Sequence, residues 1–184
     1  MAADLNDIKQ QILSDEYAAF KELYLLMYAP LMRFATIYTY SEPMAEDVLS
    51  DVFMKLWERR TLLHEVQNLR VYLYTAIKNT ALNHRNRQAA FTNAEEEELG
   101  LAPTSAPDPE NMFISAETIK RIQQIINQLP PRCKLIFQLA KEEGMRYKEI
   151  ADILGISIKT IDNQLAIALN RIGKGVLEYD RRFR

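Results

Sequence analysis

Residues 149–165 read E-I-A-D-I-L-G-I-S-I-K-T-I-D-N-Q-L, a pattern of two short helices joined by a tight turn. Gly155 lies at the turn, where a left-handed backbone costs a residue with a Cβ atom about 1 kcal/mol or more. Ser157 is a favoured N-cap of the second helix, because its hydroxyl accepts from an unpaired backbone N–H. The residues predicted to fill the interior between the helices are Ile150, Leu154, Ile156, Ile161 and Leu165. The stretch predicts a helix–turn–helix, with an ordinary corner of a helical bundle as the alternative.

Polar residues occupy the outward side of the second helix. Asn163 and Gln164 can pair with the major-groove edge of adenine, and Lys159 or Thr160 can hold a phosphate. Asp162 can accept from a cytosine amine or simply repel phosphate. The alternative for each residue is a solvated face. Because the helix holds few cations, its affinity for duplex DNA should be weak, and another part of the chain must supply binding energy.

The composition of the chain narrows the classes of protein to which it can belong. The chain has 184 residues, 48% of them hydrophobic, with five glycines and a net charge of -2. The single cysteine, Cys133, excludes an internal disulfide and indicates a reducing compartment. Cys133, His64 and His84 have no metal-ligand spacing, so we expect no metal or cofactor. Without a signal sequence or a run of 18 apolar residues, the chain is predicted to be cytoplasmic and not inserted in a membrane.

Residues 88–112 differ sharply from their surroundings. They contain three prolines, four consecutive glutamates and no lysine or arginine, which is typical of a flexible segment. Removing their six acids from the net charge of -2 leaves the rest of the chain at +4. Apolar residues recur at helical spacing on both sides. The predicted helices span about 17–40, 45–57, 68–85, 114–128, 131–142, 147–154 and 158–175. We therefore predict an all-α fold: two small helical domains, 1–89 and 114–184, joined by a flexible acidic linker, 90–113.

Two segments of the first domain have surfaces suited to partners. Residues 45–57 form an amphipathic helix whose polar side is acidic and includes Met54, with Trp57 at its border. This mixture suits a basic and apolar protein partner, or else it is a solvated face with Trp57 in the core. Residues 70–87 hold four cations, no acid, Tyr72, Tyr74 and three asparagines. Cations follow phosphates and aromatic rings stack on bases, so this helix suits melted nucleic acid. The alternative is a solvated basic face with two core tyrosines.

The order of three motifs is recognisable. A-E-D-V-L-S-D-V-F-M-K-L-W is followed by Y-L-Y-T-A-I-K-N-T-A-L-N-H-R, by the acidic linker, and by L-P-P-R-C-K-L-I-F-Q-L-A-K-E-E-G-M-R-Y-K-E-I-A-D-I-L-G-I-S-I-K-T-I. Over about residues 17–175 the chain resembles the extracytoplasmic-function group of bacterial RNA polymerase sigma factors. The resemblance implies an alternative sigma factor that binds core RNA polymerase and directs promoter-specific initiation, with an anti-sigma factor as a further candidate partner.

The resemblance also implies residue roles. Region two would dock on core polymerase through its acidic helix, with Asp47, Ser50, Asp51, Met54 and Trp57. The basic helix and the loop before it would melt and read the minus-ten element of promoter DNA, with Arg70, Tyr72, Lys78, Asn79, Asn83 and Arg85. Region four would read the minus-35 element in duplex form, with Lys159, Thr160, Asn163, Gln164 and Arg171.

A stand-alone regulator and an enzyme are the two alternatives to a sigma factor. A stand-alone helix–turn–helix regulator, with an N-terminal sensor or dimerisation domain, would need more phosphate contacts than one weakly charged helix provides. A hydrolase or transferase needs a nucleophile with a partner base, or a glycine loop for phosphate, and the sequence shows neither. Cys133 is interpreted as a core thiol. The prediction is a non-enzymatic protein without a small-molecule substrate.

Overall fold

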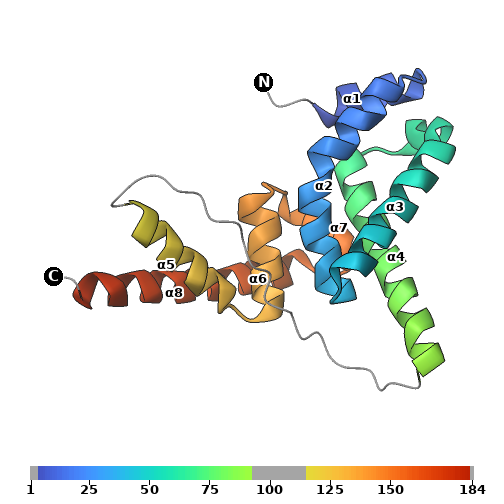
Figure 1. Cartoon of the computed structure of the whole chain (residues 1–184). Coiled ribbons are helices and arrows are strands. Elements are labelled where there is room, and N and C mark those ends of the chain that lie inside the picture. Colours follow the sequence, from blue (N-terminus) through green and yellow to red (C-terminus); the bar gives the residue numbers. More distant parts are fainter. Residues whose placement is uncertain (1–3, 93–114, 183–184) are drawn as a thin grey trace. The chain divides into compact units, whose positions relative to one another are not determined.

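The computed structural model describes residues 4–92 and 115–182, and every regular element in these two ranges is helical (Figure 1). The all-α fold class is thereby confirmed. The helices form two compact units, one within Met1–Ala102 and the other within Pro103–Arg184. The last helix of the first unit continues to Thr92, so the first three residues of the predicted linker are helical. The remainder of that linker, and Ile114, lie outside the described residues.

Over residues 4–92, the part of the first unit that the structure describes, there are four α-helices and one short 3₁₀ helix. These are α1 (Leu5–Leu13), α2 (Tyr17–Thr39), α3 (Glu42–Glu58), the 3₁₀ helix η1 (Arg60–Glu65) and α4 (Leu69–Thr92). Helices α2, α3 and α4 pack side by side, each in contact with the other two, and α1 lies against α2, α4 and η1 (Figure 1). Large side chains with almost no exposed surface fill this interior: Leu23, Leu31, Leu49, Leu56, Leu73, Tyr74 and Ile77. Burying each such side chain contributes about 1.5–3 kcal/mol.

The break between α2 and α3 has local causes. Helix α2 ends at Thr39, and Tyr40 takes a left-handed conformation with φ 54°. Ser41 is the N-cap of α3, where its hydroxyl oxygen accepts from the Met44 N–H at 3.5 Å, and Pro43 occupies the first turn. Capping fixes the residue at which α3 begins, and therefore which of its side chains face the core.

The sequence did not lead us to expect helix α1. Its signals are a local cap and an apolar pair: the Asp4 carboxylate accepts from the Asn6 N–H at 2.9 Å, and Ile8 and Ile12 lie one turn apart. Both isoleucines are buried, with exposed fractions of 2% and 0%. So short an amphipathic helix is marginal by itself, and packing on α2 and η1 stabilises it.

The second unit is arranged around its last helix. It contains α5 (Ser115–Asn127), α6 (Pro131–Phe137), the π-helical turn η2 (Gln138–Glu142), α7 (Tyr147–Leu154) and α8 (Ile158–Arg182). Helices α5, α6 and α7 all contact α8. One core cluster joins Ile126, Leu129, Cys133 and Ala168. The α-helix predicted over 131–142 changes to π-helical geometry at Gln138.

The two helices and the turn of the predicted helix–turn–helix are present as α7, 155–157 and α8. Gly155 has φ 68°, and its N–H donates to the Ala151 carbonyl oxygen at 2.8 Å. The interior differs in part from the prediction. Ile150, Ile161 and Leu165 are buried as expected, whereas Leu154 and Ile156 are only half-buried. Ile153, which lies on the same side of α7 as Ile150, is fully buried in their place.

The conformation of Gly155 gives a stability prediction. Gly155→Ala should lower the free energy of unfolding of the full chain by about 1 kcal/mol or more, because an L-residue is strained at this φ. A Cβ atom at position 155 meets no heavy atom within 4 Å, so backbone strain alone would cause the loss. Denaturant unfolding followed by circular dichroism measures it.

Gly173→Ala is the matched control. It lies within α8, and a Cβ atom there also has nothing within 4 Å. Since alanine favours a helix interior over glycine by roughly 0.5–1 kcal/mol, this variant should be neutral or more stable. Equal destabilisation by the two substitutions would contradict the assigned role of Gly155.

Candidate nucleic-acid and protein interfaces

Helix α3 buries one side and exposes the other. Its buried side consists of Ala45, Val48, Leu49, Val52, Phe53 and Leu56. Asp47, Ser50 and Met54 are exposed, Met54 with 62% of its surface, and they share one side of the helix with the half-buried Asp51. The structure thus brings together four of the five predicted docking residues on the solvent side of α3. An exposed methionine among acids offers apolar contact area within a negative potential.

The fifth docking residue, Trp57, is half-buried in an aromatic group. Its ring lies 5.5 Å from that of Tyr17 and 4.9 Å from that of Phe20. The Arg60 guanidinium lies over the Trp57 ring, with its central carbon 4.5 Å from the ring centre. Trp57 therefore packs within the unit and still has exposed surface, and its docking role stays a prediction.

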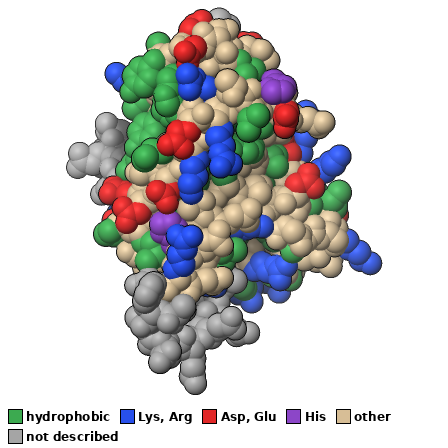
Figure 2. All heavy atoms as spheres, turned by 90° about the vertical axis from the view of Figure 1, so that its right-hand side faces the viewer, with side chains coloured by type: hydrophobic (Ala, Val, Ile, Leu, Met, Phe, Trp, Pro, Cys, Tyr) green, Lys and Arg blue, Asp and Glu red, His purple; other side chains and the backbone are tan. Residues whose placement is uncertain are grey.

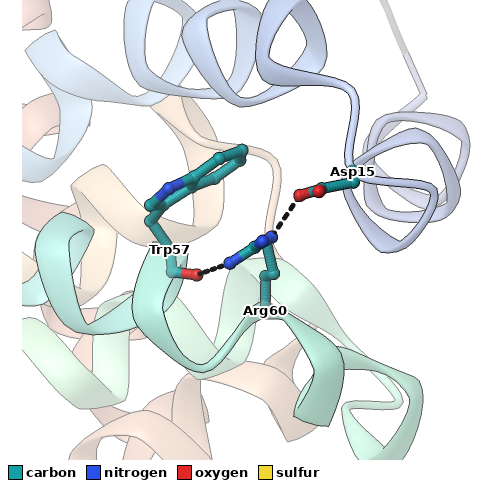
Figure 3. A network of polar contacts seen from close by, with 3 residues as sticks. All are labelled: Asp15, Trp57 and Arg60. Atoms are coloured by element: carbon teal, nitrogen blue, oxygen red, sulfur yellow. Dashed lines mark hydrogen bonds and ion pairs between the residues drawn. The ribbon is translucent and has the colours of Figure 1, made fainter.

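Arg60 joins three elements of the first unit (Figure 3). Besides its contact with the indole ring, it donates to the Trp57 carbonyl oxygen at 3.1 Å and forms an ion pair with Asp15. Asp15 lies in the turn between α1 and α2 and has a left-handed φ of 66°. The network ties the end of α3 to the turn that follows α1. Sequence reasoning missed it, because Asp15 lies 45 residues away from Arg60 in the chain.

Helix α4 also has two distinct sides. Leu69, Leu73, Ile77 and Ala81 are buried at helical spacing, and Tyr74 packs edge-on against Phe34 at 4.9 Å. Tyr72, Asn79 and Asn83 are exposed, and two and three helical turns separate the asparagines from the tyrosine, so they form one stripe. Arg70, Lys78 and Arg85 are half-buried beside it. Of the two tyrosines, Tyr74 belongs to the core and Tyr72 to the surface.

Local and long-range contacts hold α4 and the loop before it in place. Asn68 precedes the helix, and its side-chain oxygen accepts from the Val71 N–H at 3.1 Å. In the same loop, the Val66 carbonyl oxygen accepts from the Lys9 ammonium group at 2.9 Å, and only 8% of the Lys9 surface is exposed. At the other end, the His84 ring lies 3.1 Å from the Asp51 carboxylate of α3. The predicted docking helix and the predicted melting helix are therefore joined directly.

Charge on this unit is mixed. Figure 2 shows one face of the molecule, on which acidic and basic side chains lie close to one another. The acids of α3 and the cations of α4 belong to neighbouring helices. Partners of opposite charge can thus bind side by side, a polybasic protein surface on one helix and nucleic acid on the other.

The predicted minus-35 residues differ in their exposure and in their hydrogen bonds. Lys159, Asn163 and Arg171 are exposed on α8. The Thr160 hydroxyl lies 2.8 Å from the hydroxyl of Ser157, which accepts from the Thr160 N–H at 3.1 Å and caps α8 as predicted. Gln164 is half-buried, and its side-chain oxygen accepts from the Cys133 thiol at 2.9 Å.

Two further observations concern metal sites and membrane spans. Among the described residues, no three histidine, cysteine, aspartate or glutamate side chains gather where they could hold a metal ion. Over the same part of the chain, no helix is long and apolar enough to cross a membrane.

Comparison with known families assigns both units. The family model described as Sigma-70 region 2 matches residues 23–91, and the model described as Sigma-70, region 4 matches residues 119–172. Together the two models cover about two thirds of the chain, in the order that the motifs predicted. The chain belongs to the sigma-70 family of RNA polymerase sigma factors. Helix α1 of this sigma factor lies outside the region 2 match.

Relatives place the sigma factor in the extracytoplasmic-function group, as its sequence predicted. It is 29% identical over 136 residues to the ferric citrate uptake sigma factor FecI of Escherichia coli (strain K12), covering 73% of this chain and 78% of FecI. It is 26% identical over 144 residues to the ECF RNA polymerase sigma-E factor of the same strain, covering 74% and 75% of the two chains.

Two solved structures share the fold. The sigma factor RpoE in complex with the anti-sigma factor NepR from Bartonella quintana is 22% identical, with a TM-score of 0.57 over 88% of this chain and 98% of that one. CnrH in complex with the cytosolic domain of CnrY is 20% identical, with a TM-score of 0.54 over 94% and 96% of the two chains.

The Arg60 network of this sigma factor gives a spectroscopic prediction. Trp57 is the single tryptophan of the chain, so fluorescence reports its surroundings directly. Arg60→Met should shift the Trp57 emission and lower the free energy of unfolding by about 1 kcal/mol, because the cation leaves the ring. The ion pair with Asp15 should add little, since 66% of the Asp15 side chain is exposed. Arg59→Met, at an exposed neighbour, should leave the emission unchanged, and an equal shift would contradict the role of Arg60.

Proposed function

We propose that the sigma factor distributes promoter recognition over three surfaces, each with the residues assigned to it above. The exposed side of α3 binds core polymerase, the exposed side of α4 melts and reads the minus-ten element, and α8 reads the minus-35 element. The observation that supports this division best is the pairing of neighbouring helices in one unit. One exposes acids and a methionine, and the other exposes asparagines and a tyrosine beside half-buried cations.

The surface of α3 suits a protein partner better than DNA. Asp47 and Asp51 would repel phosphates, whereas they attract the cations of a basic protein surface and orient it during encounter. Met54 supplies flexible apolar area at the centre of the face, and Trp57 supplies the exposed edge of an anchored ring. Because Trp57 is held by Tyr17, Phe20 and Arg60, it loses little conformational entropy on binding.

The surface of α4 suits single-stranded DNA. Tyr72 can stack on an unpaired base, and the carboxamides of Asn79 and Asn83 can bond the base edges that melting leaves without partners. Arg70, Lys78 and Arg85 flank the stripe, where their charges can follow the phosphates. The Lys9 and Asn68 contacts fix the preceding loop, so the loop is ordered before DNA arrives.

The surface of α8 provides a second, weak contact with promoter DNA. Lys159 and Arg171 are exposed cations, but Asp162 on the same helix opposes them. When polymerase holds both units on one promoter, the second contact becomes intramolecular, and its local concentration raises the overall affinity. A stand-alone regulator lacks this advantage, so the low charge of α8 favours a polymerase subunit over that alternative.

The same division implies partners and location. The sigma factor would act as a non-catalytic specificity subunit in the cytoplasm, where its polymerase and promoter DNA are. An anti-sigma factor is a further proposed partner, because the similar RpoE was solved in complex with one. Such a partner would cover the α3 or α8 surface and block its use.

Core binding tests the α3 assignment. Asp47→Arg combined with Met54→Ala should weaken the affinity for purified core polymerase roughly tenfold or more, because it places like charges together and removes apolar contact. Fluorescence anisotropy of the labelled sigma factor measures binding, and transcription from a promoter fragment measures initiation. The matched charge change Asp7→Arg, at an exposed site on α1, should bind core normally. Unchanged core affinity of the double variant, or duplex binding and no core binding by the native chain, would overturn the assignment.

Promoter melting tests the α4 assignment. Asn79→Ala should slow open-complex formation by the holoenzyme about tenfold, since one base contact is lost, and should leave recruitment to the closed complex nearly unchanged. Permanganate reactivity of minus-ten thymines reports melting. Asn127→Ala, at an exposed asparagine of the second unit, is the control. Equal melting by the two variants would argue against base capture by Asn79.

A further inference from the structure

An exposed isoleucine lies in the middle of the surface assigned to the minus-35 element. Ile167 is on α8, and 42% of its surface is exposed. Residues three, four or seven positions apart lie on the same side of an α-helix. Asn163 therefore lies one turn before Ile167, Arg171 one turn after it and Thr160 two turns before it. Three of the residues assigned to DNA thus share one side of α8 with a side chain that cannot form a hydrogen bond.

Packing within the second unit does not account for the isoleucine. Ile161, Leu165 and Ala168 of α8 are buried and lie together on another side of the helix. With 3.6 residues in each turn, Ile167 points roughly 100° or more away from each of them. A single exposed apolar side chain is common on protein surfaces. Ile167 differs from such a side chain because of its place between residues assigned to DNA.

The major groove offers an apolar group that suits this side chain. Thymine alone among the four bases carries a C5-methyl group at the groove edge, and apolar side chains contact it. Thr160 and Ile167 are about 10 Å apart along the helix axis, which equals about three base-pair steps of 3.4 Å. A recognition helix that lies in the groove can therefore keep both residues near the DNA. Contact between the isoleucine and the methyl group removes both from water.

We propose that Ile167 is a specificity-determining residue that recognises the methyl group of a thymine in the minus-35 element. This inference rests on the proposed role of α8. It adds to the polar residues of the helix, because hydrogen bonds and phosphate contacts do not detect a methyl group. An apolar contact also needs no cation, so it suits a helix that carries few of them.

Removal of the thymine methyl group tests the contact directly. Core polymerase reconstituted with the full-length sigma factor is bound to promoter fragments that carry an A·T pair, in either orientation, at each minus-35 position in turn. Each fragment is made with thymine and with deoxyuridine, which keeps the hydrogen-bonding edge and lacks only the methyl group. At one position the native holoenzyme should bind deoxyuridine roughly three- to fivefold more weakly, the effect of burying one methyl group. With Ile167→Ala, the two fragments should bind equally there.

Two variants serve as controls. Leu169→Ala removes an apolar side chain of similar size, 51% exposed, from the side of α8 opposite to Ile167, so it should keep the native response to the methyl group. Ile167→Val retains a branched apolar side chain and should keep most of that response. Because position 167 is exposed, thermal unfolding of Ile167→Ala should match that of the native chain.

The outcomes separate the inference from the function on which it rests. If the native holoenzyme binds thymine and deoxyuridine equally at every minus-35 position, while Asn163→Ala still changes the base preference, only the role of Ile167 is refuted. A loss of affinity with Ile167→Ala that leaves the methyl response intact also overturns it, since the side chain would then contact another group, such as a polymerase surface. If minus-35 base changes do not affect the native holoenzyme, and Asn163→Ala and Arg171→Ala have no effect, the proposed role of α8 itself fails.

Discussion

The mutual burial of the apolar sides of α2, α3 and α4 is the constraint on which the first unit depends. Each helix has one apolar side, and the three can be removed from water together only when those sides meet. The opposite sides are then necessarily exposed. The acids of α3 and the asparagines of α4 face solvent for this reason, and no separate interaction is needed to present them. A substitution that reoriented either helix would displace a binding surface along with the core.

Polar contacts then set details that hydrophobic burial leaves open. Burial is not directional, whereas hydrogen bonds and ion pairs fix particular atoms. Arg60 holds the end of α3 against the α1–α2 turn, Lys9 holds the loop before α4, and His84 joins α4 to Asp51. All three join elements distant in sequence. In the second unit the bond between Cys133 and Gln164 has a similar effect, since it restricts a side chain on the solvent-facing helix.

Much of the fold was predictable because its signals are local. Helical spacing, the left-handed Gly155 and the Ser157 cap each depend on a few neighbouring residues, and the structure has all of them. The features that the sequence analysis did not predict also have physical reasons. Helix α1 is short and stabilised by packing on distant elements, and the π-helical turn after Phe137 has no strong sequence signal. Ile153 is buried in place of Leu154 because the position of α7 against α8 decides which side turns inward.

The sequence by itself determined the longer helices, the family and the identity of the polar residues on each exposed side, because amphipathic spacing and motif order are properties of the chain. The tertiary structure decided how far each of those residues is exposed and which distant side chains contact it. It separated Tyr72 at the surface from Tyr74 in the core, anchored Trp57 beneath Arg60, and engaged the oxygen of Gln164 with a thiol 31 residues away. Such contacts depend on how distant helices pack, and periodicity within one helix carries no information about its neighbours.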